Sequence, residues 1–183
     1  GEGSAEQAAD EIEKDVRRLE IITERFSKIG SVPKLELNNL AQIIHDSVTY
    51  LKPRSPKKIS YLLDFAEDKE LFIPVNGPLF SWVIENVCKN AIDAMGGVGT
   101  IVLNLKEEAR YVLIDISDTG RGISRAEQRD IFNPGYTSKK RGWGLGLSLS
   151  KRIIRDYHRG KIFVKGSTVG KGTTFRIVMR KST

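Results

Sequence analysis

The sequence predicts an α/β domain in which a mixed β-sheet is covered by helices. Strand-like segments outnumber the helical segments that could cross between them, which favours a mixed sheet over a regular succession of βαβ units. The 183 residues, of which 39% are hydrophobic, suffice for one full-sized domain with a small appendage. A separate helical stripe at the N-terminus supplies that appendage, so we predict one helix followed by the domain.

The N-terminal helix is expected over residues 8–29. Its apolar residues recur at intervals of three or four along one stripe: Ile12, Val16, Leu19, Ile22, Phe26 and Ile29. Gly30 and the nearby Pro33 are typical of the end of a helix. One helix cannot bury this stripe alone, so it should pack against a helix of the same chain, of a partner or of a symmetric copy, or fold back on its own domain. We therefore divide the chain into residues 1–31 and 32–183.

The remaining elements follow from the spacing of apolar residues and from the Gly and Pro residues between them. Strands are expected near residue 35 and over 59–65, 71–75, 100–106, 110–117, 161–165 and 173–179; helices are expected over about 38–51, 78–95 and 145–157. In the strand at 110–117, Val112, Ile114 and Ile116 alternate with Leu113 and Asp115. Residues 118–144 are rich in glycine, polar and basic residues, and no helix or strand is predicted there.

The composition excludes several classes of protein. Apolar runs are too short to span a bilayer, and the first residues lack the basic and apolar regions of a signal peptide. The one cysteine, Cys88, excludes an internal disulfide and suits a reducing compartment, so we expect a cytoplasmic fragment without membrane contact, whose parent protein could still be anchored. The net charge of +7 would permit nucleic-acid binding, but the 30 Lys and Arg residues are spread along the chain, so no nucleic-acid partner is expected.

The helix at 78–95 carries a polar face. Asn86, Lys89, Asn90 and Asp93 stand at i, i+3, i+4 and i+7, which places them on one side of the helix. A solvated surface is the ordinary explanation of such a stripe. Asparagine, however, is a poor helix former, and apolar residues flank this stripe on both sides. Two carboxamides in that setting suit a hard cation and polar ligand atoms.

Two glycine-rich segments follow. The segment Asp118-Thr-Gly-Arg-Gly122 comes directly after a strand, where a carboxylate can accept a hydrogen bond from an exocyclic amine and glycines let a flat ring approach the backbone. The segment GWGLGLSLS places Gly142, Gly144 and Gly146 before a helix, as in a phosphate-binding loop. Each segment alone could be a plain turn or connector.

Together, these motifs resemble the ATP-binding domain of sensor histidine kinases, within the superfamily that also contains gyrase, Hsp90 and MutL. The set comprises N-x-x-x-N, D-x-G-x-G, F-x-P at residues 132–134, G-x-G-x-G, and G-x-G-T at 170–173, in that order, and the resemblance covers residues 35–179. It implies a two-layer α/β sandwich of the Bergerat type, with helices on one face of a mixed sheet and ATP bound between the helices and a mobile lid.

The resemblance also implies roles for individual residues. Asn90 would be the Mg²⁺ ligand, Asp118 would read the adenine amino group, and Thr173 or Thr174 would complete the adenine pocket. Asn86, Lys89 and the lid cation Lys139 would act in catalysis near the phosphates. The implied nucleotide-binding set is Asn86, Asn90, Asp93, Asp118, Gly120, Gly122, Lys139, Gly142, Gly144, Gly146, Leu147, Thr173 and Thr174.

The residue type at position 86 differs between members of the superfamily. Gyrase, Hsp90 and the related serine kinases resemble one another in having a glutamate there, which can take a proton from water or a hydroxyl. A neutral imidazole already offers a lone pair, so Asn86 favours a histidine acceptor over an ATPase clamp or an anti-sigma-type serine kinase. The neighbouring Glu85 is expected to face elsewhere.

The chain lacks the expected acceptor, because neither His45 nor His158 stands in a setting like H-E-x-x-x-P. The segment RFSKIGS resembles the second helix of a dimerisation hairpin. We therefore expect a catalytic fragment that donates the γ-phosphoryl of Mg²⁺–ATP to a histidine hairpin of the parent kinase or of a second protomer, with a response regulator as the next acceptor. A homodimer through the N-terminal helix, and a non-catalytic ATP-binding scaffold, remain open alternatives.

Overall fold

The computed structural model describes residues 33–137 and 144–181. The chain divides into two units, residues 1–34 and 35–183, and the description below concerns the second. The predicted N-terminal helix lies outside the described residues, so that helix and the proposed division after residue 31 remain predictions.

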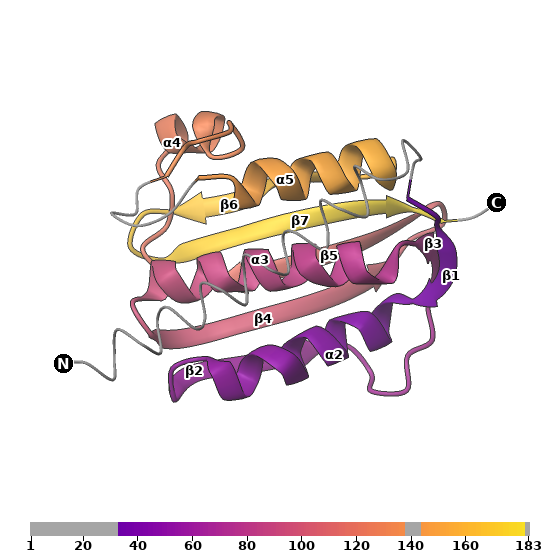
Figure 1. Cartoon of the computed structure of the whole chain (residues 1–183). Helices are drawn as coiled ribbons and strands as arrows, with labels where there is room; N and C mark the ends of the chain where they lie inside the picture. The colour runs from indigo at the N-terminus through magenta and orange to yellow at the C-terminus, as the bar shows by residue number, and fades with distance from the viewer. Residues whose placement is uncertain (1–32, 138–143, 182–183) are drawn as a thin grey trace, which may run out of the picture. The chain divides into compact units, whose positions relative to one another are not determined.

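A five-stranded mixed sheet forms one layer of the domain (Figure 1). Its strands, in spatial order, are β2 (Lys58–Asp64), β4 (Val98–Glu107), β5 (Tyr111–Asp118), β7 (Gly172–Arg180) and β6 (Lys161–Thr168). Strands β2 and β4 are parallel, and the other three pairs are antiparallel. This confirms the expected mixed sheet.

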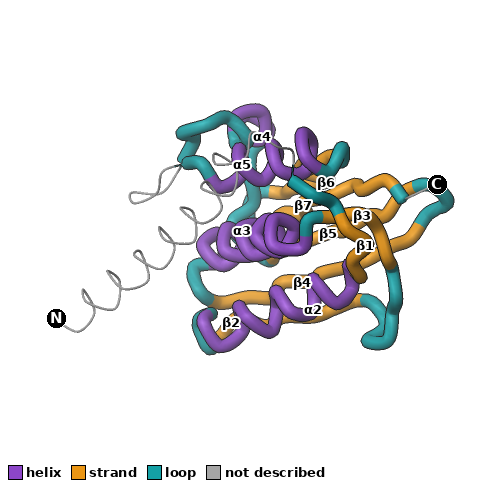
Figure 2. Tube along the Cα trace, turned by 45° about the vertical axis from the view of Figure 1, so that its right-hand side comes forward, coloured by secondary structure: helices purple, strands orange, loops and turns teal. Residues whose placement is uncertain are grey.

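Helices α2 (Leu40–Leu51), α3 (Gly77–Met95) and α5 (Gly146–Arg152) cover one face of that sheet, with α3 in the middle (Figures 1 and 2). Local sequence fixes where α2 and α3 begin, because the side chains of Asn39 and Asn76 accept hydrogen bonds from the first-turn amides. Gly96 ends α3 in a left-handed conformation, with φ 63°. The arrangement is the two-layer sandwich that the motifs implied.

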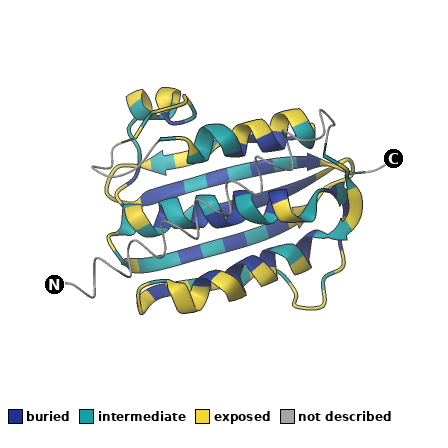
Figure 3. Cartoon of the chain, viewed as in Figure 1, coloured by how far each residue is buried: buried dark blue, intermediate teal, exposed yellow. Residues whose placement is uncertain are grey.

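The hydrophobic core lies between the two layers (Figure 3). Alternate residues of the central strands point toward the helices and are at most 3% exposed: Ile101, Leu103, Leu105, Val112, Ile114, Ile116, Ile177 and Met179. Helix α3 supplies the opposing surface, including the fully buried Phe80, Val83 and Ile84. Burial of both layers holds α3 firmly over β4 and β5, and its polar face is positioned by that packing.

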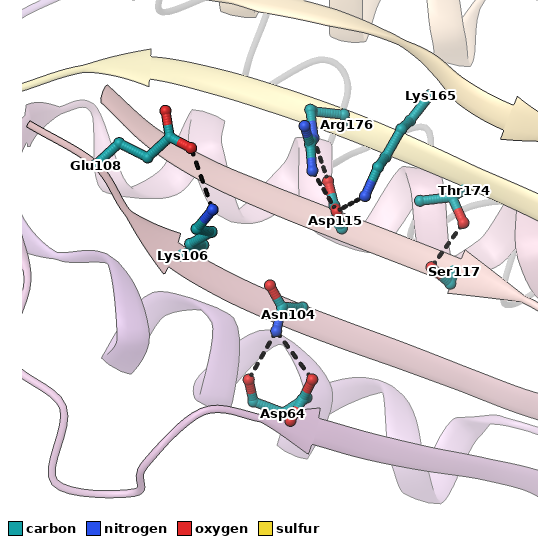
Figure 4. Close-up of polar contacts among 9 residues, drawn as sticks. All are labelled: Asp64, Asn104, Lys106, Glu108, Asp115, Ser117, Lys165, Thr174 and Arg176. Carbon is teal, nitrogen blue, oxygen red and sulfur yellow. Dashed lines mark hydrogen bonds and ion pairs between the residues drawn. The ribbon is translucent and has the colours of Figure 1, made fainter. Parts of the chain in front are cut away.

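The opposite face of the sheet carries polar pairs (Figure 4). Asp115 accepts two hydrogen bonds of 2.7 Å from the Arg176 guanidinium and a third of 2.7 Å from the Lys165 ammonium. Burial acts to raise the pKa of Asp115, but these cationic donors outweigh it and hold the pKa below its usual value. The hydroxyls of Ser117 and Thr174 lie 2.8 Å apart on the same face.

Two short strands, β1 (Glu36–Asn39) and β3 (Phe72–Val75), form a separate antiparallel pair near the starts of α2 and α3. A 3₁₀ turn at Lys52–Arg54 follows α2 and leads toward β2. No helix in residues 33–137 and 144–181 combines the length and the apolar character that a bilayer crossing needs.

The structure corrects the sequence prediction in two places. Residues 118–144 contain a short helix, α4 (Arg125–Asp130), which is stabilised by a capping box between Ser124 and Glu127. The helix predicted over 145–157 is α-helical only to Arg152 and continues as a π-type turn over Ile153–Tyr157. In that turn the backbone bonds reach one residue further, since the His158 amide donates to the Ile153 carbonyl.

Candidate functional site

Asp118 lies at the end of β5, directly opposite Thr173 of β7. Its Oδ1 accepts hydrogen bonds from the amides of Gly120, at 2.8 Å, and Thr173, at 3.3 Å. The residue is only 8% exposed, and burial raises the pKa of its carboxyl group although these two amides oppose the rise. Within the described residues Oδ2 makes no hydrogen bond, so one carboxylate oxygen is fixed and the other remains available to a ligand.

The loop after Asp118 is held against the end of α3. The Arg121 amide donates to the Ala94 carbonyl at 2.9 Å. A Cβ added at Gly120 would lie 2.8 Å from both the Ala94 carbonyl carbon and its oxygen, so only glycine fits this approach. On its other side the loop meets the β6–β7 connection, where the Gly170 amide donates to the Arg121 carbonyl at 2.7 Å. Two of the sequence motifs thus share one hydrogen-bonded corner of the fold.

Ser167 joins the same corner from β6. Its hydroxyl accepts from the Ile123 amide at 2.7 Å, donates to the Gly172 carbonyl at 3.1 Å and lies 2.8 Å from the Thr173 hydroxyl. Thr173 is 4% exposed and faces the same side of the sheet as Asp118. The side chain of Thr174 points to the opposite side, toward Ser117, so the structure brings only Thr173 to Asp118.

Asn86 connects α3 to α5. Its Nδ2 donates to Oγ of the fully buried Ser150 at 3.0 Å. A Cβ at Gly146 would lie 2.5 Å from Asn86 Oδ1, so the absence of a side chain there lets the two helices approach. This carboxamide therefore helps to position the start of α5, the helix that follows the glycine loop.

The rest of the polar face of α3 is only partly covered. Lys89 and Asn90 are half-buried and Asp93 is exposed, whereas Val87 and Cys88 on the adjoining sides are buried. Burial, and then the nearby Glu85 charge, raises the pKa of the Cys88 thiol to about 12, which makes it unreactive. Lys89 and Asn90 thus stand one turn beyond Asn86, on the same face of the helix.

Glu85 faces away from Asn86, as the sequence analysis expected. It is 4% exposed, and its Oε1 accepts from the Ser81 hydroxyl at 3.4 Å. Ser81 is in turn 2.9 Å from the hydroxyl of Ser47 on α2. This carboxylate therefore lies on the α2 side of α3, whereas Asn86 contacts α5.

The glycine loop is described only in part. Lys139 and Gly142, both predicted to act on phosphates, lie outside the described residues. Gly144 and Gly146 are described, as is the half-buried Leu147. The Gly135 amide donates to the Gly144 carbonyl at 2.9 Å, which joins the segment after Pro134 to the end of the loop.

The two histidines have different environments. His158 is 6% exposed; its Nε2 accepts from the Asn76 amide at 3.0 Å, and its Nδ1 lies 2.9 Å from the Ile153 carbonyl. These two contacts require a neutral ring protonated at Nδ1, and burial lowers the pKa of His158. The His45 side chain is 55% exposed and lies 3.7 Å from the Asp46 carboxylate. His158 is thus structural.

Sequence reasoning missed two serines of this site. Ser150 and Ser167 each complete a hydrogen bond between segments that are far apart in the chain. No local pattern reports such contacts, although Ser150 ends the segment GWGLGLSLS and Ser167 stands shortly before G-x-G-T. Among the described residues no three His, Cys, Asp or Glu side chains are grouped as metal ligands.

Comparison with protein families assigns residues 77–183 to the family described as histidine kinase-, DNA gyrase B- and HSP90-like ATPases. Sporulation kinase E of Bacillus subtilis (strain 168) is 31% identical over 173 residues, which are 92% of this chain and 23% of that protein. Sensor histidine kinase ZraS of Salmonella typhi is 32% identical over 178 residues, which are 96% of this chain and 38% of that protein. The chain therefore spans well under half the length of these relatives.

Solved structures show the same architecture. The catalytic domain of histidine kinase ThkA matches with a TM-score of 0.73 and 26% identity, over 81% of this chain and 97% of that one. A structure of ThkA in complex with the response regulator protein TrrA matches with a TM-score of 0.70 and 24% identity, over 93% of this chain and 49% of that one. The latter likeness concerns the fold alone.

Proposed function

This chain belongs to the family of histidine kinase-, DNA gyrase B- and HSP90-like ATPases, and from that membership we propose that it binds Mg²⁺–ATP and donates the γ-phosphoryl group to a histidine on a helical hairpin. Its relatives include sensor histidine kinases, and a histidine kinase catalytic domain shares its fold. The observation that carries the proposal is the corner around Asp118, where a buried carboxylate keeps one oxygen unused beside a glycine backbone.

That corner suits the adenine base. An exocyclic amine donates hydrogen bonds, and Asp118 Oδ2 accepts them. Gly120 and Gly122 let the loop pack closely against the backbones of Ala94 and Thr168, which fixes it beside Asp118. Thr173 adds a hydroxyl on the same side of the sheet. We assign Asp118, Gly120, Gly122 and Thr173 to base binding, and Thr174 is left out because it faces Ser117 on the other side.

Asn90 fits the Mg²⁺ ion in its chemistry. Its carboxamide oxygen is a hard ligand on the half-buried face of α3. Mg²⁺ takes few protein ligands and shares the rest of its coordination between phosphate oxygens and water. The bound ion would neutralise phosphate charge.

The remaining residues would hold the phosphates. Lys89 presents a cation next to Asn90, and Lys139 is our candidate for a second cation from the loop. Asn86 touches Ser150 and Gly146, so we propose that it acts chiefly by fixing α5 beneath the phosphate-binding segment. Asp93, Gly142, Gly144 and Leu147 complete the proposed nucleotide site. Catalysis would consist of positioning and charge neutralisation.

We place the phosphoryl acceptor outside the described residues. His158 is buried and both of its ring nitrogens have backbone partners, and His45 lies on α2 away from the polar face of α3. We propose that the acceptor histidine belongs to a hairpin of the parent kinase or of a second protomer. A response regulator would receive the phosphate next, as the complex of ThkA with the response regulator protein TrrA suggests.

Transfer of labelled phosphate tests this function. The chain would be incubated with Mg²⁺ and γ-labelled ATP together with purified dimerisation hairpins taken from relatives of this family. We expect label on a hairpin histidine, an acid-labile phosphoramidate, and none when the acceptor is replaced by glutamine. Binding of ATP without transfer to any of several hairpins would favour the scaffold function, whereas hydrolysis or serine labelling would favour the ATPase or serine kinase.

A further inference from the structure

We propose that Ser167 is a positioning residue that fixes the hydrogen-bond direction at Thr173 and thereby makes the site prefer adenine over a 6-oxopurine. The inference rests on the proposed nucleotide site and deepens it, because it concerns how one base is distinguished from another. Ser167 belongs to none of the motifs identified in the sequence.

The three neighbours of the Ser167 hydroxyl determine which hydrogen bonds it donates and which it accepts. A serine hydroxyl has one hydrogen to donate and two lone pairs that accept. The Ile123 amide, 2.7 Å away, can only donate, and the Gly172 carbonyl, 3.1 Å away, can only accept. The amide therefore uses one lone pair, and the carbonyl takes the single hydrogen.

The Thr173 hydroxyl must then be the donor across the remaining 2.8 Å contact. This is the one assignment in which all three contacts of Ser167 form at once. Thr173 is 4% exposed, so its hydroxyl has little opportunity to turn to solvent instead. With its hydrogen directed at Ser167, the oxygen of Thr173 can offer only lone pairs to anything else nearby.

Two acceptors consequently stand opposite each other on neighbouring strands. Asp118 and Thr173 are paired in the β5–β7 register, and the inference places the 6-substituent of the base against Asp118 Oδ2 and the Thr173 oxygen. At that position the 6-amino group of adenine donates to the two acceptors, whereas the 6-oxo group of hypoxanthine is itself an acceptor and finds no donor. A Thr173 oxygen that faced N1 instead would accept from the N1–H of hypoxanthine and favour ITP. If Ser167 is removed, the Thr173 hydroxyl is released and can turn to donate to the oxo group.

The experiment measures the affinities of Mg²⁺–ATP and Mg²⁺–ITP by competition with a fluorescent nucleotide, in the wild type and in folded variants. We expect Ser167→Ala to lower the preference for ATP over ITP by about fivefold or more, the effect of one neutral hydrogen bond. Ser167→Thr keeps the hydroxyl and should retain the wild-type ratio. Adding Thr173→Val to Ser167→Ala removes the released donor and should raise the ratio above that of Ser167→Ala, but not to the wild-type value, because the Thr173 acceptor is lost as well.

Ser117→Ala is the matched control, because it breaks the other serine–threonine hydroxyl pair, on the opposite face of the sheet. It should leave the ratio unchanged. If Ser167 merely braces the loop, Ser167→Ala will weaken both nucleotides equally, and an unchanged ratio overturns the inference. Should Ser167→Ala not fold, Ser167→Gly, which likewise lacks the hydroxyl, carries the same expectation. A wild type that binds neither nucleotide would instead refute the proposed function.

Discussion

Substitution of Gly120 by alanine tests the packing of the nucleotide corner most sharply. The backbone of Gly120 lies outside the left-handed region, so alanine is not excluded by its φ angle. The cost arises from space, because the new methyl group would lie 2.8 Å from the carbonyl carbon and oxygen of Ala94 and 2.8 Å from Asp118 Oδ1. The backbone of Ala94 cannot yield as a flexible side chain would.

The loss of stability can be estimated for two ways in which the protein could accommodate the new methyl group. If the methyl group is forced into place, overpacking costs about 1–3 kcal/mol. If the loop moves away, it loses the Gly120 amide bond to a carboxylate, worth about 1.5–3 kcal/mol, and weakens the Arg121–Ala94 bond, worth about 1 kcal/mol. The cheaper route sets the cost, so we expect Gly120→Ala to lower the free energy of unfolding by about 1–3 kcal/mol.

Urea unfolding followed by circular dichroism measures this loss. Gly166→Ala is the matched control, because a Cβ there meets no atom within 4 Å and its φ is not left-handed. The control should stay within about 0.5 kcal/mol of the wild type. A Gly120→Ala variant as stable as Gly166→Ala would refute the close approach of the loop to α3 on which the site depends.

Two further predictions concern His158 and Asn86. Because burial lowers the folded-state pKa of His158, the unfolded chain binds more protons below about pH 6.5, and stability should fall as the pH drops from there toward the folded-state pKa. Between pH 7.5 and 5.5, the free energy of unfolding should depend less on pH in His158→Gln than in the wild type, whereas His45→Gln should behave as the wild type does. An equal pH dependence in the wild type and both variants would contradict this. Asn86→Ala and Ser150→Ala should each destabilise the fold, and their double-mutant cycle should give a coupling of about 0.5–1.5 kcal/mol, whereas additive effects would show that the 3.0 Å contact contributes nothing.

Much of the fold could be predicted because its signals are local. The alternation at Val112, Ile114 and Ile116 and the apolar spacing of α3 each lie within one element, and the structure has the predicted strand and helix there. Helix α4 was missed although its S-x-x-E capping box was present in the sequence, because residues 118–144 were judged by their glycine and charge content. Strand order and the parallel β2–β4 pair depend on contacts between distant segments, which no local pattern contains.

In the candidate site, too, some residues could be found from local sequence and others only from contacts between distant segments. Asp118 and its glycines could be found from a motif, since a strand end and a turn are local features. The choice between Thr173 and Thr174 required the register of β5 and β7, because adjacent strand residues face opposite sides. Ser150 and Ser167 act only through partners far away in the chain, so only the folded structure could reveal them.

Calorimetric titration of a Mg²⁺-bound, non-hydrolysable ATP analogue tests the central claim most directly. The wild type should bind one equivalent. Asp118→Asn should weaken binding about 10-fold or more, as expected for loss of a charged acceptor, and Asn90→Ala should weaken it only when Mg²⁺ is present. Asp64→Asn, an exposed carboxylate on the other face of the sheet, should bind as the wild type does. Folded wild-type protein that binds no nucleotide, or that binds it equally well after Asp118→Asn, would contradict the proposed site.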